Sequence, residues 1–194
     1  LWETLPRGPG VGLIAPGGGT SVFMTDCSTQ AGLEVPLLSP RTRETLSRFI
    51  ARVNTIIENP IDLGSASYLP QTVMDTLAAM AGEETIHSFL LYHYVYPYKN
   101  VGARELGREF LKSVCKVRRT MDKPIYVALY CPFQNFPEAD EARREIIDVL
   151  NQWKVPYTMD LQSGVRMLKR VWEYARHLQA RNVDRDVFLG PAVR

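Results

Sequence analysis

The sequence has few cysteines, no strong excess of either charge and no long apolar run. Its three cysteines, Cys27, Cys115 and Cys131, are too few and too scattered for a disulfide framework or a zinc site. The net charge is only +2 without a dense lysine or arginine tract, which argues against nucleic acid as the main partner. No apolar stretch approaches the about 20 residues that a membrane-spanning helix needs. These absences predict a cytoplasmic protein with reduced thiols.

The composition is that of an ordinary folded domain. Hydrophobic residues make up 45% of the 194 residues, enough to bury a core without disulfides or metals. Residues 1–9, rich in proline and glycine, are expected to be a linker, residues 10–181 one domain, and residues 182–194 a tail or second linker. The first residue is leucine, so we expect the chain to be part of a longer protein.

Short apolar segments alternate with amphipathic stretches along the chain. Strands are predicted at residues 11–15, 33–38, 86–95, 125–130 and 155–159. Helices are predicted at residues 20–32, from Pro40 with Leu46, Phe49, Ile50 and Val53 on one face, and at residues 71–81, 101–118, 138–153 and 163–179. Residues 59–64 contain a proline and a glycine and are predicted to be a loop.

This alternation indicates a parallel sheet with helices on both faces. The predicted fold class is therefore α/β, a flavodoxin-like three-layer α/β/α domain. Five strands in this rhythm suit the order 2-1-3-4-5. In that order, a ligand crevice lies beyond the carboxyl ends of the first and third strands.

A glycine-rich turn, Pro16-Gly17-Gly18-Gly19-Thr20-Ser21, follows the first predicted strand. Glycine lets an anion approach the backbone amides, and a helix N-terminus carries a partial positive charge of roughly half a unit. The turn therefore predicts a phosphate site at Gly17, Gly18, Gly19, Thr20 and Ser21, with both hydroxyls as further donors. A tight turn that binds nothing explains the same residues, and the turn matches neither a Walker loop nor Gly-x-Gly-x-x-Gly.

Aromatic residues crowd the end of the third predicted strand. We expect the loop at residues 96–100 to face the glycine turn across the crevice. Alternation places Tyr92, Tyr94 and Tyr96 on one side of the sheet and His93 on the other. Three interpretations of these tyrosines are open: they stack on a planar ligand, they form a docking surface, or they pack under helices. His93 is a candidate for the pocket wall, with a histidine packed inside the strand as the competing interpretation.

Several motifs in the first third of the chain match one family. Residues 11–22 read VGLIAPGGGTSV, and Ala31-Gly32-Leu33, Leu38-Ser39-Pro40 and Asn59-Pro60-Ile61-Asp62-Leu63 follow in that order. Their order and spacing resemble the second flavodoxin-like domain of the NDP-forming acyl-CoA synthetases, relatives of succinyl-CoA synthetase. The resemblance spans about residues 10–180.

The resemblance implies one domain of an acid–thiol ligase. The full enzyme interconverts acyl-CoA, phosphate and ADP with acid, CoA and ATP, through a phosphohistidine on another domain. By this resemblance, the helix after the glycine turn seats the phosphoryl group, and Asn59 and Asp62 shape the adjoining wall. No residue of this chain is expected to be catalytic or to bind a metal.

The resemblance also implies cofactors and partners. The full enzyme needs CoA and ATP or ADP with Mg, whereas this chain alone is expected to bind only phosphate or sulfate and to be inactive. The implied partners are the CoA-binding and ATP-grasp domains or subunits of the same enzyme, and a homodimer is left open.

Two features depart from the family pattern. Pro16 stands where the family often has asparagine, and tyrosines stand where small residues and prolines usually follow the third strand. They leave open a non-catalytic interaction module that keeps the fold but not the chemistry. A third interpretation is an independent flavodoxin-like protein, which predicts tight binding of flavin or nucleotide.

Overall fold

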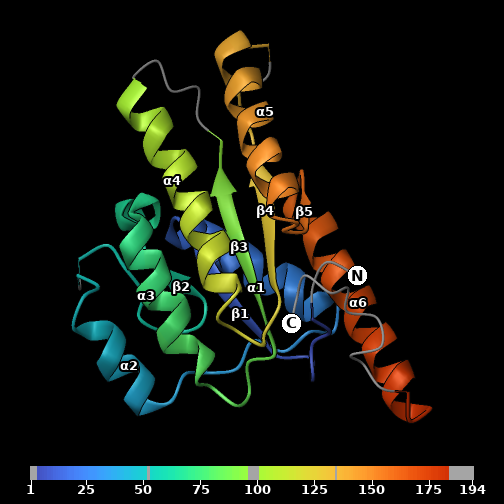
Figure 1. The fold of residues 1–194 in the computed structure, drawn as a ribbon. Helices are drawn as coiled ribbons and strands as arrows, with labels where there is room; N and C mark the ends of the chain where they lie inside the picture. Colours follow the sequence, from blue (N-terminus) through green and yellow to red (C-terminus); the bar gives the residue numbers. More distant parts are fainter. Residues whose placement is uncertain (1–3, 52, 96–100, 134, 184–194) are drawn as a thin grey trace.

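The strands form one parallel sheet (Figure 1). The computed structural model describes residues 4–51, 53–95, 101–133 and 135–183, and of residues 68 and 101–107 the backbone alone. The strand order is β2-β1-β3-β4-β5 with every pair parallel, which confirms the predicted order and fold class. The strands are β1 (Val11–Ala15), β2 (Ile61–Asp62), β3 (Ser88–Tyr94), β4 (Ile125–Tyr130) and β5 (Tyr157–Thr158).

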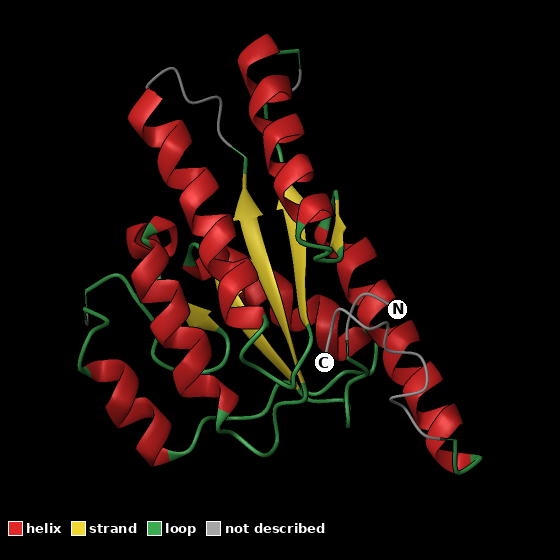
Figure 2. Cartoon of the chain, viewed as in Figure 1, coloured by secondary structure: helices red, strands yellow, loops and turns green. Residues whose placement is uncertain are grey.

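Helices cover both faces of the sheet (Figure 2). On one face lie α1 (Gly18–Gln30) and α6 (Leu161–Ala180), which contact each other. On the other face lie α2 (Pro40–Ser47), η1 (Gly64–Tyr68), α3 (Pro70–Ala81), α4 (Val101–Arg118) and α5 (Pro137–Gln152). Within the described residues, no helix combines the length and the apolar character needed to cross a membrane.

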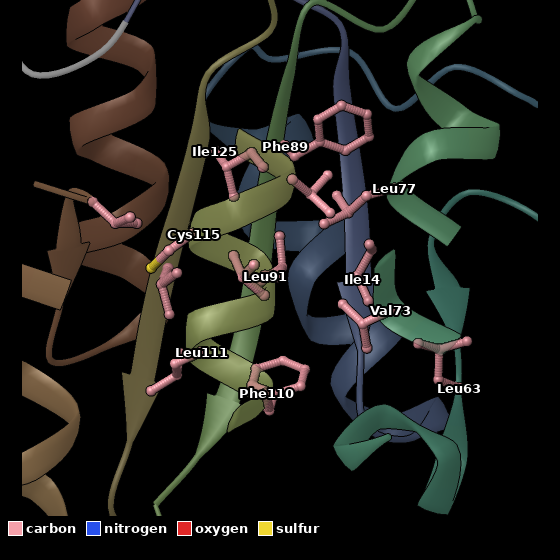
Figure 3. Packing of buried hydrophobic residues seen from close by; sticks show 14 of the residues in the cluster. Ile14, Leu63, Val73, Leu77, Phe89, Leu91, Phe110, Leu111, Cys115 and Ile125 are labelled. Atoms are coloured by element: carbon pink, nitrogen blue, oxygen red, sulfur yellow. The ribbon is translucent and has the colours of Figure 1, made fainter. Parts of the chain in front are cut away.

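Apolar side chains fill the space on both sides of the sheet. Phe89 and Leu91 of β3 pack with Leu111 of α4 in the larger cluster (Figure 3). Between them in sequence, Leu90 belongs to the opposite cluster, together with Leu168 of α6. Successive side chains of a strand point to opposite faces, so a strand covered on both sides is apolar throughout.

The helix that begins at Pro40 is shorter than the apolar spacing predicts. α2 ends at Ser47, because Phe49 N donates to Leu46 O and so closes the last turn with a tighter, three-residue spacing. Of the predicted apolar face, Leu46 and Ile50 are buried, whereas Phe49 and Val53 are exposed.

Residues before β1 pack on the domain. Leu5 is buried against Ala175 and Leu178 of α6. Arg7 forms an exposed ion pair of 3.2 Å with Asp122, which contributes little to stability in water. Part of the predicted linker therefore lies against the last helix.

The second strand does not lie where the sequence predicts it. β2 lies inside the predicted loop at residues 59–64, with Ile61 opposite Ile14 and Asp62 opposite Ala15 of β1. Among the described residues, the predicted strand at 33–38 pairs with the sheet by an isolated bridge between Glu34 and Gly10. The strand prediction for residues 33–38 and the loop prediction for residues 61–62 are therefore wrong.

The side chain of Asn59 accounts for this difference. Its Oδ1 accepts a hydrogen bond from Leu13 N at 2.9 Å, and its Nδ2 donates to Val11 O at 2.9 Å and to Pro36 O at 3.0 Å. The amide thus occupies the backbone groups of β1 with which a longer second strand would pair. Asn59 is itself buried, so it joins both segments to the sheet edge.

The third strand alternates as predicted for its described residues. Tyr92 and Tyr94 lie on the face covered by α1 and α6, while His93 lies on the other face. Its imidazole is buried and stacks on Phe110 of α4, with ring centroids 4.8 Å apart. Burial lowers the pKa of His93 to about 4, so the ring is neutral at pH 7. Tyr96 and the loop at 96–100 lie outside the described residues.

The buried amide gives a test of the sheet edge. Asn59→Ala is expected to lower the free energy of unfolding by about 3 kcal/mol, because buried backbone groups of β1 lose their partners. Urea unfolding followed by circular dichroism measures the change. Asn151→Ala, at an exposed site on α5, is the control and should change stability by less than about 0.5 kcal/mol. Equal stability of Asn59→Ala and the parent chain would contradict this role.

His93 gives a pH test of the core. Its pKa lies below the 6.5 of an unperturbed histidine, so the unfolded chain binds a proton first as the pH falls. The stability that neutral His93 contributes is complete above about pH 6.5 and is lost towards pH 4, by up to about 3 kcal/mol. His93→Phe keeps the stack on Phe110 and should flatten this part of the stability profile.

Urea unfolding at a series of pH values between 4.5 and 7.5 measures the profile. His177→Asn, at an exposed position of α6, is the matched control and should retain the slope of the parent chain. A parent-like slope in His93→Phe would show that other groups cause the acid sensitivity.

Candidate functional site

The glycine turn joins β1 to α1 at the carboxyl end of the sheet. Gly17 precedes the first helical residue with an extended backbone, at φ 171°, and no side chain caps the helix. Ser21 N and Ser21 Oγ both donate to Gly17 O, at 3.0 Å and 3.2 Å. The predicted Ser21 donor is therefore buried and directed into the helix, whereas Gly18 and Gly19 are exposed.

The first turn of α1 differs from that of other helices. Among α1, α2, α3, α5 and α6, only α1 begins with neither a proline nor a side-chain cap. Pro40, Pro70 and Pro137 begin α2, α3 and α5, and proline brings no amide donor to a first turn. Asp160 caps α6 by accepting a hydrogen bond from Ser163 N at 2.7 Å. The start of α1 therefore has the most unused amide donors of these helices.

Neither packing nor backbone conformation requires the three glycines. A Cβ at Gly17 or Gly19 would meet nothing within 4 Å, and a Cβ at Gly18 would meet only Asp62 Oδ2, at 3.5 Å. No acceptor among the described residues bonds the amides of residues 18–20. The missing side chains leave these amides open to a small molecule.

A cavity of about 530 Å³ lies against the turn. It is lined by Pro16, Gly17, Gly18, Gly19, Thr20 and Phe23 on one side and by Tyr92, Tyr94 and Tyr130 on the other. Its size lies within the about 300–1,000 Å³ of small-molecule sites. It is found at the carboxyl ends of β1, β3 and β4, where the strand order predicts a crevice.

Three tyrosines form the wall opposite the turn. The rings of Tyr92 and Tyr130 are stacked, with centroids 5.9 Å apart and 21° between their planes. Tyr94 stands edge-on to both, and its hydroxyl shares a 2.8 Å hydrogen bond with Thr20 Oγ1. Burial, reinforced by Tyr94 and Tyr130, raises the pKa of Tyr92, so its phenol stays protonated. Thr20 therefore ties the tyrosine wall to the first turn of α1.

The predicted wall residues lie in three different places. Asp62 is buried beside Gly18, and its Oδ1 accepts a hydrogen bond from Gly64 N at 2.8 Å. The Asn59 amide is bonded to backbone, and His93 is on the opposite face of the sheet, so neither lines the cavity. The structure thus groups the glycine turn with Asp62 but not with Asn59 or His93.

Two lining residues were missed by the sequence analysis. Tyr130 lies opposite Tyr94 in the pairing of β4 with β3, so the predicted strand order contains the signal for it. Phe23 lies one turn into α1 and is 44% exposed. The helical spacing places it next to the glycine turn, but only the structure shows that it borders the cavity.

No metal site is evident in the part of the chain that the structure describes. There, no group of three or more histidine, cysteine, aspartate or glutamate side chains is placed to hold a metal ion. The three cysteines, Cys27, Cys115 and Cys131, all lie within the described residues and form no disulfide there. The chemistry available at the cavity is therefore that of amides, hydroxyls and aromatic rings.

No family model and no curated protein matches this sequence, but solved structures do. A protein of Pyrococcus horikoshii OT3 has a TM-score of 0.70 at 18% identity, over 91% of this chain and 38% of that chain. The dinucleotide-forming acetyl-coenzyme A synthetase 1 of Candidatus Korarchaeum cryptofilum has a TM-score of 0.66 at 17% identity, over 90% of this chain and 35% of that one. Its complex with phosphate and ADP has a TM-score of 0.65.

These similarities concern the fold, because the sequence identities are low. The chain spans little more than a third of the length of these solved proteins, 35% to 38%. The predicted resemblance is confirmed at this level: the chain has the fold of one part of an acetyl-coenzyme A synthetase.

Proposed function

We propose that this chain is one domain of an acyl-CoA synthetase-like ligase and that it seats a phosphoryl group at the first turn of α1. The observation that carries the proposal is the set of open amides at residues 18–20, which border a cavity at the carboxyl end of β1. The similar synthetase was solved with phosphate and ADP, which supports a phosphate-handling role.

The proposed site binds an anion through oriented amides. A helix N-terminus stabilises an anion by about 0.3–1 kcal/mol, and a hydrogen bond to a charged group adds about 1.5–3 kcal/mol. Among the described residues that line the cavity there is no lysine or arginine, and the Asp62 carboxylate lies beside Gly18. We therefore expect inorganic phosphate to bind weakly, with a Kd of about 1–10 mM.

The rest of the proposed enzyme lies outside this chain. Other domains would supply the phosphorylated histidine, the CoA site and the site for ATP or ADP with Mg. The proposed domain is residues 10–181, and the proposed location is the cytoplasm. Gly17 to Thr20 hold the phosphoryl oxygens in this scheme, while Ser21 stabilises the turn and Asp62 limits the charge that the site accepts.

One observation favours a second function, the non-catalytic interaction module. Of the twelve large apolar side chains exposed among the described residues, six lie near the carboxyl ends of the strands or at the starts of the helices that follow them. They are Val22, Phe23, Leu69, Tyr130, Phe136 and Met159. Exposed apolar groups that gather at one end of a domain are typical of a surface that a partner protein covers. Replacement of Gly18 and Gly19 by valine in the full-length protein distinguishes the two functions. If the protein is a ligase, acyl-CoA formation is lost. If it is an interaction module, partner binding is unchanged.

The glycine turn gives a direct binding test. Phosphate titration of the 194-residue chain, followed by NMR, is expected to shift the amide signals of residues 18–20. Gly18→Val with Gly19→Val should weaken this binding at least about tenfold, because the side chains cover the amides. Gly82→Val, where a Cβ would meet only Ala79 O at 3.9 Å, is the control and should bind phosphate as before.

Stability measurements show whether the fold itself requires glycine at position 19. Gly19→Ala should raise the free energy of unfolding by up to about 0.5–1 kcal/mol, because its Cβ enters open space in a helical position. Denaturant unfolding measures this change. Loss of stability in Gly19→Ala, or absence of phosphate shifts at residues 18–20, would contradict the proposed role of the turn.

A further inference from the structure

We infer that the cavity selects an acid whose acyl group carries an aromatic ring. The ring would lie against Tyr92, Tyr94 and Tyr130, and the anionic end would reach the amides of residues 18–20. This inference rests on the proposed function and specifies its substrate class, an aryl carboxylic acid or its acyl phosphate.

The first argument is the wall itself. Four of the described lining residues are aromatic, and they come from three different elements, α1, β3 and β4. Tyr92 and Tyr130 stack while Tyr94 stands edge-on to both, so each ring restricts the others. A planar ligand therefore meets aromatic surfaces whose orientation is already set, which lowers the entropic cost of binding it.

The second argument is the distance between ring wall and anion site. The hydroxyl of Tyr94 bonds Thr20 at 2.8 Å, so the aromatic wall begins at the first turn of α1. A ligand with a ring directly attached to, or one carbon from, its acidic group can contact both. The cavity of about 530 Å³ has room for both groups.

The third argument is charge complementarity. An aromatic cavity also suits an organic cation, whose charge is attracted to ring faces. Here, the Asp62 carboxylate lies beside Gly18, but it accepts a hydrogen bond from Gly64 N and is not among the described lining residues. The first turn of α1 does line the cavity and contributes positive potential there. The site therefore favours an aryl anion over an aryl cation.

Phosphonates test the inference on the 194-residue chain. Phenylphosphonate is expected to bind about tenfold more tightly than methylphosphonate, and more tightly than cyclohexylphosphonate of similar size, because aromatic pairs add to the effect of buried area. NMR titration should shift signals of residues 18–20 and of the three tyrosines together. Benzyltrimethylammonium, the cationic probe, should bind more weakly than phenylphosphonate.

Two matched variants locate the effect. Tyr130→Leu removes a 41% exposed ring of the wall and should reduce the preference for phenylphosphonate over methylphosphonate about threefold to tenfold. Phe136→Leu removes a 50% exposed ring outside the lining and should leave the preference unchanged. Phe136→Leu should also leave inorganic phosphate binding unchanged, because Phe136 does not line the cavity.

The outcomes separate this inference from the proposed function. Phosphate shifts at residues 18–20 without any gain from the phenyl group would overturn the aryl specificity and leave the phosphate site standing. Tighter binding of benzyltrimethylammonium would also overturn the aryl-acid assignment. If neither phosphate nor any phosphonate shifts residues 18–20, the proposed function fails and the substrate class fails with it.

Discussion

The buried amide of Asn59 is the interaction on which the arrangement of the site depends. It bonds Val11 and Leu13 of β1 and so fixes the segment that continues into β2. Asp62, the second residue of β2, lies beside Gly18, where its carboxylate borders the start of α1. A side chain that takes no part in the cavity therefore sets the environment of the glycine turn.

The unbonded amides at the start of α1 stand out when they are compared with the starts of the other helices. In α2, α3 and α5 a proline occupies the first turn, and in α6 the side chain of Asp160 caps it. Such closures satisfy or remove amide donors that otherwise cost free energy when they are buried without a partner. At α1 the same donors face a cavity instead of a side chain. A ligand bound there would accept hydrogen bonds from these amides, as a capping side chain does at other helices.

The sequence predicted the architecture better than the site. Four of the five apolar segments are strands, and their alternation with helices was enough to predict the strand order, because buried parallel strands are apolar on both faces. The position of the second strand was not predictable in this way, since a two-residue strand has no periodicity and its partner Asn59 acts across 46 residues. Asn59 was assigned to the pocket wall by the family resemblance and His93 by its place near the end of the third strand, whereas the structure turns both side chains away from the cavity. The position of Tyr130 beside Tyr94 could be predicted only with the register of β4 against β3.

The proposed site would combine weak anion binding with a fixed aromatic wall. Because Asp62 lies beside Gly18 and the described lining residues include no basic side chain, we expect a low affinity for a free dianion. A domain that receives a phosphoryl group from a partner gains from such weakness, because tight binding of free phosphate would occupy the turn between cycles. Affinity then has to come from another part of the ligand. The stacked and edge-on tyrosines supply it next to the anion, tied to the turn through Thr20. In this proposal, one cavity holds both the rings that select the ligand and the amides that place its anionic end.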